Sequence, residues 1–330
     1  MLCILYVIAI GTGFGAVGLL AERVMPASWS RRWIWCVVIA ASLALPGFYR
    51  VHNNWSITEA FEQQSLDASV GNPLARASLV ALDPDMWTHS GSQATLINRA
   101  WLAASALLLL WVVANAGRVA YLVSVARGGR GQRSPVIVEG IPIVVTESIG
   151  PATVGFWRSR VLVPRWVLAL PSAQRRYVLR HEEEHRSAHD AHLLLLASLT
   201  LLLTPWNVAL WWQLRRLRLA VEMDCDNRVV AALGDAPAYG GLLLKVAEAS
   251  SRGPRLQPAL LGGVGTLERR LTALLAPAPL RKAQRFLLPV LAIALLFVVL
   301  STPHPVLGSG SHVHGGAPTA VAATTTARLP

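Results

Sequence analysis

Two histidines four residues apart, with a glutamate directly after the first, are the residues of this chain best suited to chemistry. They are His181 and His185, with Glu182 after His181, in the segment HEEEH. Residues four apart lie on one face of a helix, so both imidazoles can bind the same metal ion. Glu182 lies beside them, where it can accept a proton from water as a general base. The spacing therefore predicts a zinc-dependent hydrolase.

A third metal ligand must come from elsewhere, because a catalytic zinc ion takes three protein ligands and keeps one position for water. The segment VEMDCD offers Glu222, with Asp226 four residues later on the same helical face. We expect Glu222 to bind the metal and Asp226 to hydrogen-bond to one of the imidazoles. A thiolate can bind zinc, but Cys225 points about 300° around the helix from Glu222. We therefore interpret Cys225 as a packing residue.

Two further polar residues, His189 and Asp190, follow the histidine pair. His189 comes eight residues after His181 and lies on roughly the same helical face. That position suits an outer group of the metal site and a surface residue equally well. Asp190 is better placed to order the end of the helix or a neighbouring loop.

The histidine pair lies in a segment that predicts one long helix from Ser172 to Leu203. Pro171 followed by Ser172 is a typical start of a helix, and Pro205 marks its end. Upstream, short apolar runs between residues 135 and 166 (VIVE, IPIVV and RVLVP) predict strands. An exposed strand edge beside a zinc helix can bind an extended peptide by main-chain pairing.

The apolar stretch 193–212 constrains the topology. A single membrane crossing there would leave His185 and Glu222 on opposite sides of the bilayer, where they could not share a metal ion. A break at Thr204-Pro205 divides the stretch into parts of about eleven and seven residues, too short to cross about 30 Å of hydrocarbon. We therefore predict a re-entrant or interfacial helical hairpin, with the zinc site close to the membrane.

The composition is that of a membrane protein. Of the 330 residues, 53% are hydrophobic and only 15% are charged, against about 25% charged in an average soluble domain. Four apolar segments predict transmembrane helices; they are residues 2–21, 33–48, 100–124 and 286–301. The first is followed by Glu22 and Arg23 instead of a cleavage site, so we expect it to be retained.

The distribution of charge predicts the orientation. The loop 22–32 has three arginines and one acid, and the segment 125–282 has 21 basic against 12 acidic residues, a net charge of +9. The loop 50–99 has three arginines against five acids, net −2. The positive-inside rule therefore places 22–32 and 125–282 in the cytoplasm, and both termini outside. The overall charge of +12 is then mostly an orientation signal, and we do not expect direct binding of nucleic acid.

These observations predict a mainly α membrane protein of about four transmembrane helices plus a cytoplasmic α+β zinc protease domain. The three cysteines do not form a disulfide framework. The predicted divisions are two transmembrane helices with a short cytoplasmic loop (1–49), an extracytoplasmic loop (50–99), a third transmembrane helix (100–124), the zinc domain (125–282), a fourth transmembrane helix (283–301) and a disordered extracytoplasmic tail (302–330).

The order of these segments resembles the M56 peptidase family, the membrane metalloproteases that include the BlaR/MecR-type antibiotic sensors. The segments that carry the resemblance are SIGPATVGFWRSRVLVP, HEEEHRSAHD, TPWN and EMDCD. The resemblance implies a gluzincin-like fold, Zn²⁺ on His181, His185 and Glu222, and Glu182 as the catalytic base. Tyr239, in DAPAYGGLLLKVAE, matches a tyrosine of the family, and a role for it in the transition state is a hypothesis.

The resemblance also implies a bacterial inner-membrane enzyme that cleaves a cytoplasmic or membrane-proximal protein, such as a transcriptional repressor, and cleaves itself. The antibiotic sensors carry a penicillin-binding domain after the last crossing, whereas about thirty residues follow it here. We therefore do not expect β-lactam sensing by that route. The alternatives are a housekeeping protease for membrane-protein quality control and a signalling scaffold without catalytic activity. The sequence indicates no oligomeric state.

Overall fold

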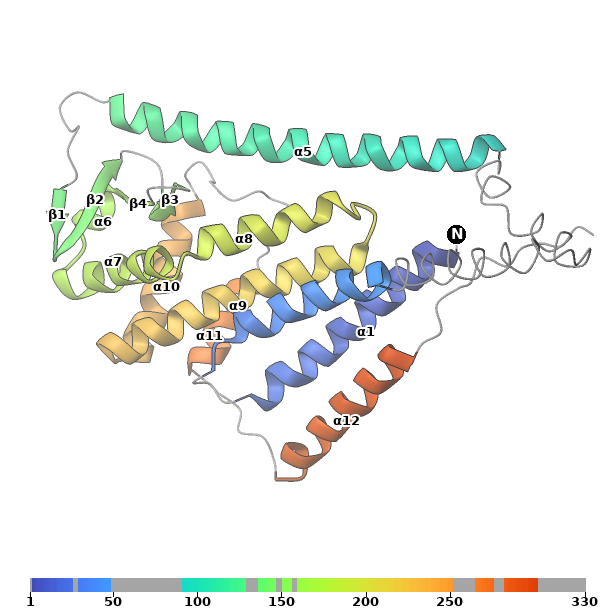
Figure 1. The fold of residues 1–330 in the computed structure, drawn as a ribbon. Coiled ribbons are helices and arrows are strands. Elements are labelled where there is room, and N and C mark those ends of the chain that lie inside the picture. The colour runs from blue at the N-terminus through green and yellow to red at the C-terminus, as the bar shows by residue number, and fades with distance from the viewer. Residues whose placement is uncertain are drawn as a thin grey trace, which may run out of the picture.

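The structure is a computed structural model that describes residues 2–25, 29–48, 91–128, 136–146, 150–155, 159–251, 265–275 and 282–301. The predicted tail 302–330 and most of the predicted loop 50–99 lie outside these residues. The described chain is mostly helical and has one small sheet. Figure 1 shows long helices running towards one end of the molecule, where the sheet lies.

Among the described residues, four helices are long and apolar enough to cross a membrane, as the sequence predicts. They are α1 (Leu2–Val24), the helix Arg31–Phe48, α5 (Gly91–Gly128) and α12 (Lys282–Ser301). Two of these helices expose nearly all of their most apolar stretch, as helices that face lipid do. No residue of that stretch is buried in α5, and 6% of it is buried in α12. Helices α1 and α12 lie side by side, and Val299 of α12 contacts Gly13 of α1.

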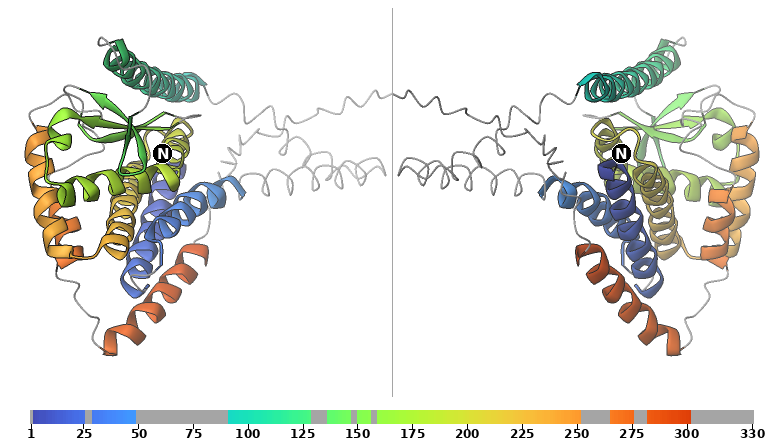
Figure 2. Two further views of the ribbon diagram at one scale, coloured as in Figure 1. Left: turned by 90° about the vertical axis from the view of Figure 1, so that its left-hand side faces the viewer. Right: turned by 90° about the vertical axis from the view of Figure 1, so that its right-hand side faces the viewer.

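A helical hairpin follows the histidine pair and turns back at the break that the sequence shows. It consists of α8 (Asp190–Leu199), the 3₁₀ helix η1 (Thr200–Leu202) and α9 (Val208–Leu233). Asn207 ends the turn and caps α9, because its Oδ1 accepts hydrogen bonds from the backbone N–H groups of Ala209 and Leu210. The hairpin lies between α5 and α1 in Figures 1 and 2, so membrane-type helices flank it on two sides.

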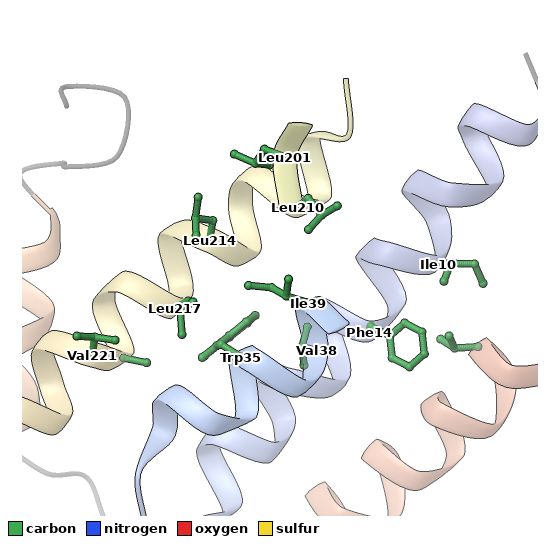
Figure 3. Close-up of a cluster of buried hydrophobic side chains, with 12 residues drawn as sticks. Ile10, Phe14, Trp35, Val38, Ile39, Leu201, Leu210, Leu214, Leu217 and Val221 are labelled. Carbon is green, nitrogen blue, oxygen red and sulfur yellow. The ribbon is translucent and has the colours of Figure 1, made fainter. Parts of the chain in front are cut away.

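The largest apolar core joins this hairpin to the membrane helices (Figure 3). Its buried members come from α1, from the helix Arg31–Phe48, from α12 and from the hairpin: Ile10, Phe14, Trp35, Val38, Ile39, Leu201, Leu210, Leu214, Leu217, Ala220, Val221 and Val299. Between membrane helices, close van der Waals packing of such side chains favours association, because lipid tails are as apolar as the side chains themselves. The first half of α9 is therefore fixed to the bundle by packing.

The single long helix predicted from Ser172 to Leu203 is wrong. Helix α7 (Ser172–Ser187) ends at Ala188, and His189 has a left-handed conformation with φ 55° and ψ 34° before α8 begins. In a continuous helix, a side chain five residues after His185 would point about 140° away from it. The break instead brings the Asp190 carboxylate within 2.8 Å of His185 Nδ1.

A four-stranded sheet covers α7, with strand order β1-β2-β4-β3. The strands are β1 (Val136–Val138), β2 (Ile141–Thr146), β3 (Ala152–Val154) and β4 (Arg160–Pro164). Three of them fall in the predicted apolar runs, and β3 was not predicted. Strands β2 and β4 are parallel and the other two pairs are antiparallel. Strand β3 forms the edge nearest to α7, the helix of the histidine pair.

The remaining helices close the domain around α7 and α9. They are the single turn α6 (Arg165–Leu168), α10 (Ala236–Ser251) and α11 (Gly265–Leu275). Apolar residues of β2, β4, α7 and α10 form a second core, and α9, α10 and α11 share a third. Leu179 of α7, which is fully buried, belongs to the second core and fixes the helix two residues before His181.

Close packing between α1 and α9 can be tested at Gly15. A Cβ atom there would lie 2.4 Å from the indole of Trp212, whose ring is already packed edge-on against Trp35. We expect Gly15→Leu to destabilise the full chain by about 1–3 kcal/mol because the helices must separate. Gly117→Leu on α5 is the control, since a Cβ atom there meets no atom within 4 Å. Equal unfolding temperatures for the two variants in detergent would contradict this packing.

Candidate metal centre

One turn of α7 brings two imidazole nitrogens together. His181 Nε2 and His185 Nε2 are 3.2 Å apart, and the two rings meet edge to face with centroids 4.7 Å apart. The spacing of four residues produces this pair directly, since it places both side chains on one face of the helix. Both histidines are mostly buried, with exposed side-chain fractions of 14% and 15%.

Glu222 of α9 faces the same two nitrogens. Its Oε2 lies 3.8 Å from His181 Nε2 and 3.9 Å from His185 Nε2. A tetrahedral zinc ion with bonds of roughly 2.0–2.1 Å requires ligand atoms about 3.3 Å apart. The three distances of 3.2, 3.8 and 3.9 Å are close to that triangle, so these residues fit a zinc ion after small side-chain shifts.

Cys225 offers a second way to complete the site. Ligand atoms of His181, His185 and Cys225 lie within 4.8 Å of one another, so these three form a possible metal-binding group. However, the Cys225 thiol lies 3.3 Å from Nδ1 of His181, on the side of the ring away from Glu222. Burial raises the pKa of this thiol to about 11, so the thiol is protonated when no metal is bound. The geometry therefore favours Glu222 over Cys225.

The Nδ1 atoms of both histidines are occupied by other hydrogen bonds. His185 Nδ1 donates to Asp190 Oδ2 at 2.8 Å. His181 Nδ1 lies 2.9 Å from the hydroxyl of Tyr239, which donates to Asp226 Oδ1 at 2.7 Å. These contacts leave the two Nε2 atoms free for a metal ion, the arrangement that orients zinc-binding histidines.

Glu182 is buried against the edge of the sheet. The hydroxyl of Thr153 in β3 is 3.1 Å from Glu182 Oε2 and 2.8 Å from the backbone carbonyl of Glu182. Burial raises the pKa of the Glu182 carboxyl above its ordinary value, although His185 and the Thr153 hydrogen bond act in the opposite direction. A raised pKa suits a carboxylate that accepts and returns a proton near neutral pH.

The site carries an uneven distribution of charge. Burial, the neighbouring His185 and Arg270 lower the pKa of His181 to about 3. Burial alone would lower the pKa of His185, but its hydrogen bond with Asp190 raises that pKa well above the ordinary value. Burial alone would raise the pKa of Glu222, but Arg270 and the histidines lower it to about 2. Without metal, His181 is therefore neutral, and His185 carries an additional proton and a positive charge beside an ionised Glu222.

Three residues of the site were not predicted in these roles. Arg270 of α11 contacts Glu222 Oε2 at 3.0 Å and donates two hydrogen bonds of 2.7 Å to Asp226. Asp190 hydrogen-bonds to a proposed ligand instead of ordering only a helix end. Thr153 contacts the proposed base. No sequence pattern marks Arg270, which lies 44 residues after Asp226.

Two of the predicted site residues take positions that differ from the expectation. His189 is exposed, and its Nδ1 lies 3.0 Å from the carbonyl of Ser187, so the structure does not bring it to the histidine pair. The left-handed turn at His189 is the reason, because it ends the helical face that the prediction extended. Tyr239 is at the site, but it contacts Nδ1 of His181, away from the metal-facing nitrogens. Asp226 reaches His181 through Tyr239 and directly at 3.5 Å.

Comparison with known protein families gives a match over most of the chain. The family model described as BlaR1 peptidase M56 matches residues 14–274, which is most of the chain and includes both α7 and α9. The chain belongs to peptidase family M56. Membership in M56 implies a membrane metallopeptidase, in keeping with the four apolar helices and the possible metal site. A search of curated proteins found no match to this M56 chain.

The proton on His185 gives a prediction for metal binding. Zinc binds neutral imidazole, so binding must release this proton, and the affinity should rise with pH until the raised pKa of His185 is passed. We expect calorimetric titrations at neutral pH, in buffers of different ionisation enthalpy, to show about one proton released per zinc ion. Binding without release of protons and without dependence on pH would contradict the assignment.

Arg270 gives a second prediction, on stability. Without its guanidinium, the buried carboxylates of Glu222 and Asp226 lose their shared cation, a loss that typically costs about 3–5 kcal/mol. We expect Arg270→Ala to lower the unfolding temperature of the metal-free chain, and added zinc to restore part of it. Arg269→Ala is the matched control, because Arg269 is the exposed neighbour on the same helix. Equal effects of the two substitutions would show that Arg270 does not neutralise the site.

Proposed function

We propose that this chain is a zinc metalloendopeptidase of the gluzincin type, with His181, His185 and Glu222 as its metal ligands. The observation that carries the proposal is the convergence of three ligand atoms, from α7 and α9, at distances of 3.2, 3.8 and 3.9 Å. Helix α9 is the returning arm of the apolar hairpin that follows α7, so the convergence depends on the tertiary fold. Zinc, when bound, supplies Lewis-acid activation of water and of the scissile carbonyl.

Glu182 is the general base in this proposal. Its carboxylate accepts the proton of the attacking water and then donates it to the leaving amine, as its position next to His181 allows. The hydroxyl of Thr153 orients the carboxylate from the sheet. Tyr239 acts here as a positioning residue for His181, because its hydroxyl lies on the Nδ1 side of that ring.

The edge of the sheet supports a peptide as substrate. Strand β3 pairs with β4 on one side, and its Thr153 contacts Glu182. Among the described residues no strand pairs with the other side of β3. An extended peptide added there by main-chain pairing would lie beside the proposed base.

We place the site in the cytoplasm, just below the membrane. Glu22 at the end of α1 pairs with Arg216 of α9 at 2.6 Å, so the basic loop 22–32 and the metal site lie at the same end of the bundle. The positive-inside rule assigns that end to the cytoplasm. Glu222 follows Arg216 by six residues, which is about 9 Å along a helix. The substrate is then a cytoplasmic or membrane-proximal protein.

The hairpin is re-entrant in this proposal. Gln213 of α9 donates to the carbonyl of Gly11, in the middle of α1, at 2.7 Å. At the tip, Trp101 and Ser105 of α5 donate to the carbonyls of Leu203 and Leu202 at 3.0 and 2.9 Å. Such pairing is what backbone carbonyls require inside hydrocarbon. A surface helix would not contact the middle of a transmembrane helix.

The biological role that we propose is regulated proteolysis in the bacterial inner membrane, with cleavage of a repressor and self-cleavage as its reactions. Membership of M56 supports this role, and so does the direct contact of α9 with the transmembrane helices, because such contact can couple the membrane to the site. A quality-control protease would use the same chemistry on a broader set of substrates. A scaffold would not need Glu182.

The Glu182→Gln variant tests the catalytic proposal. The amide cannot accept the proton, and general-base catalysis typically contributes about 10²–10⁴-fold. We expect proteolysis to fall by that factor while the zinc content of the purified full chain stays at one ion. Glu183→Gln is the matched control, since Glu183 pairs with Arg186 outside the metal site.

Three outcomes separate the candidate functions. A zinc-containing wild type whose proteolysis depends on Glu182 supports the enzyme. Signalling output that is unchanged in Glu182→Gln supports a scaffold and contradicts the proposal. A wild type that binds no zinc after metal loading contradicts both the ligand set and the enzyme.

A further inference from the structure

The membrane helix Arg31–Phe48 begins in contact with the metal centre. Arg32, in its first turn, donates from Nη1 to Asp190 Oδ1 at 2.6 Å. The other oxygen of the same carboxylate accepts from His185 Nδ1 at 2.8 Å. A guanidinium, a carboxylate and a proposed ligand imidazole thus form a continuous chain. The exposed side-chain fractions of Arg32 and Asp190 are 16% and 3%, so water screens this pair little.

A second contact fixes the start of the same helix to α9. The Asp224 carboxylate accepts hydrogen bonds from the Ser30 hydroxyl at 2.6 Å and from the backbone N–H groups of Arg31 and Arg32 at 3.0 Å each. These are the N–H groups that a helix start leaves without partners, so Asp224 caps the helix from another segment. Asp224 lies two residues after Glu222. The first turn of the membrane helix is therefore bound to both elements of the hairpin.

Arg32 has one neighbour that could share its role. Arg228 of α9 places Nη2 3.7 Å from Asp190 Oδ2, but its Nε–H group already donates a hydrogen bond to Glu184 at 2.8 Å. The contact from Arg32 is more than 1 Å shorter and reaches the oxygen that His185 does not use. Arg32 is thus the cation that fixes the orientation of the Asp190 carboxylate.

We propose that Arg32 is a positioning residue for His185, acting through Asp190, and that the membrane helix Arg31–Phe48 thereby controls the metal centre. The inference rests on the proposed function, since it takes His185 as a ligand. A movement of this helix that separates Arg32 from Asp190 frees the carboxylate to turn and weakens the orientation of His185. By linkage, metal binding in turn favours the position of the helix that is seen here.

The test uses zinc affinity of the purified full chain, measured by competition with a chelator. Outer hydrogen-bonding partners of metal ligands typically contribute about 10–100-fold to affinity. We expect Arg32→Gln to lose affinity by that factor, and Arg32→Lys to recover most of it because an ammonium can still donate to Asp190. Arg31→Gln is the matched control: it removes the same charge from the same helical turn, and the Arg31 side chain contacts Met223 instead of the carboxylate.

A double variant separates positioning from a general structural effect. If Arg32 acts through Asp190, adding Arg32→Gln to Asp190→Asn should lower zinc affinity no further than Asp190→Asn alone. If the two losses multiply, Arg32 acts by another route and the proposal is wrong. The unfolding temperature of each metal-free variant is recorded alongside, and a loss of affinity that only follows a loss of stability also overturns the proposal.

The result also distinguishes this inference from the proposed function. A wild type that binds zinc tightly, with Arg32→Gln binding it equally well, refutes the role of Arg32 and leaves the metalloprotease intact. A wild type that binds no zinc refutes the metalloprotease, and the role of Arg32 with it. Loss in Arg32→Gln, recovery in Arg32→Lys and no change in Arg31→Gln support the coupling of the membrane helix to the metal.

Discussion

The structure depends on one helix that serves two environments. The first half of α9 packs among the membrane helices through Leu210, Leu214 and Leu217, and the second half carries Glu222, Asp224 and Asp226 to the site. Because a helix is stiff over this length, packing in the bundle determines where these carboxylates lie. The histidine pair on α7 is fixed separately, by the core between α7 and the sheet. The metal centre forms where these two cores meet.

Buried charge at this junction is balanced by arginines from distant segments. Arg270 pairs with Glu222 and Asp226, Arg32 pairs with Asp190, and Arg216 pairs with Glu22. An unpaired buried carboxylate would be strongly destabilising, so Glu222, Asp226 and Asp190 each require a cation nearby. The same arginines connect the site to its surroundings, because Arg32 begins a membrane helix and Arg270 lies on α11, which precedes α12 in the chain. Charge neutralisation and coupling to the membrane therefore use the same residues.

The sequence predicted those features that depend on local spacing. The four apolar segments, the hairpin break and the meeting of His181 with His185 follow from composition and helical periodicity, and all are present. The approach of Glu222 was predicted from the residue pattern VEMDCD, and the topology without a crossing between His185 and Glu222 followed from the metal ion that they would share. The roles of Arg270, Arg32 and Thr153 could not be predicted, since each depends on a contact between segments far apart in the chain. The break at His189 was missed because no local pattern marks its left-handed conformation, and the contact of Asp190 with Arg32 that follows the break joins segments far apart in the chain.

The interaction of Arg270 with Glu222 has a consequence for how tightly the site can bind zinc. The guanidinium contacts Oε2, the same carboxylate oxygen that faces both Nε2 atoms. A metal ion and Arg270 therefore share one oxygen, and the positive charge of each weakens the attraction of the other. Asp226 reduces this conflict, because its carboxylate accepts two hydrogen bonds from the guanidinium and offsets part of its positive charge. A displacement of α11 towards or away from α9 would move Arg270 relative to Glu222 and so change the net charge next to the metal ion. The position of α11 therefore sets the electrostatics of the site. The helix Arg31–Phe48 has a comparable role in our proposal, because it sets the orientation of His185.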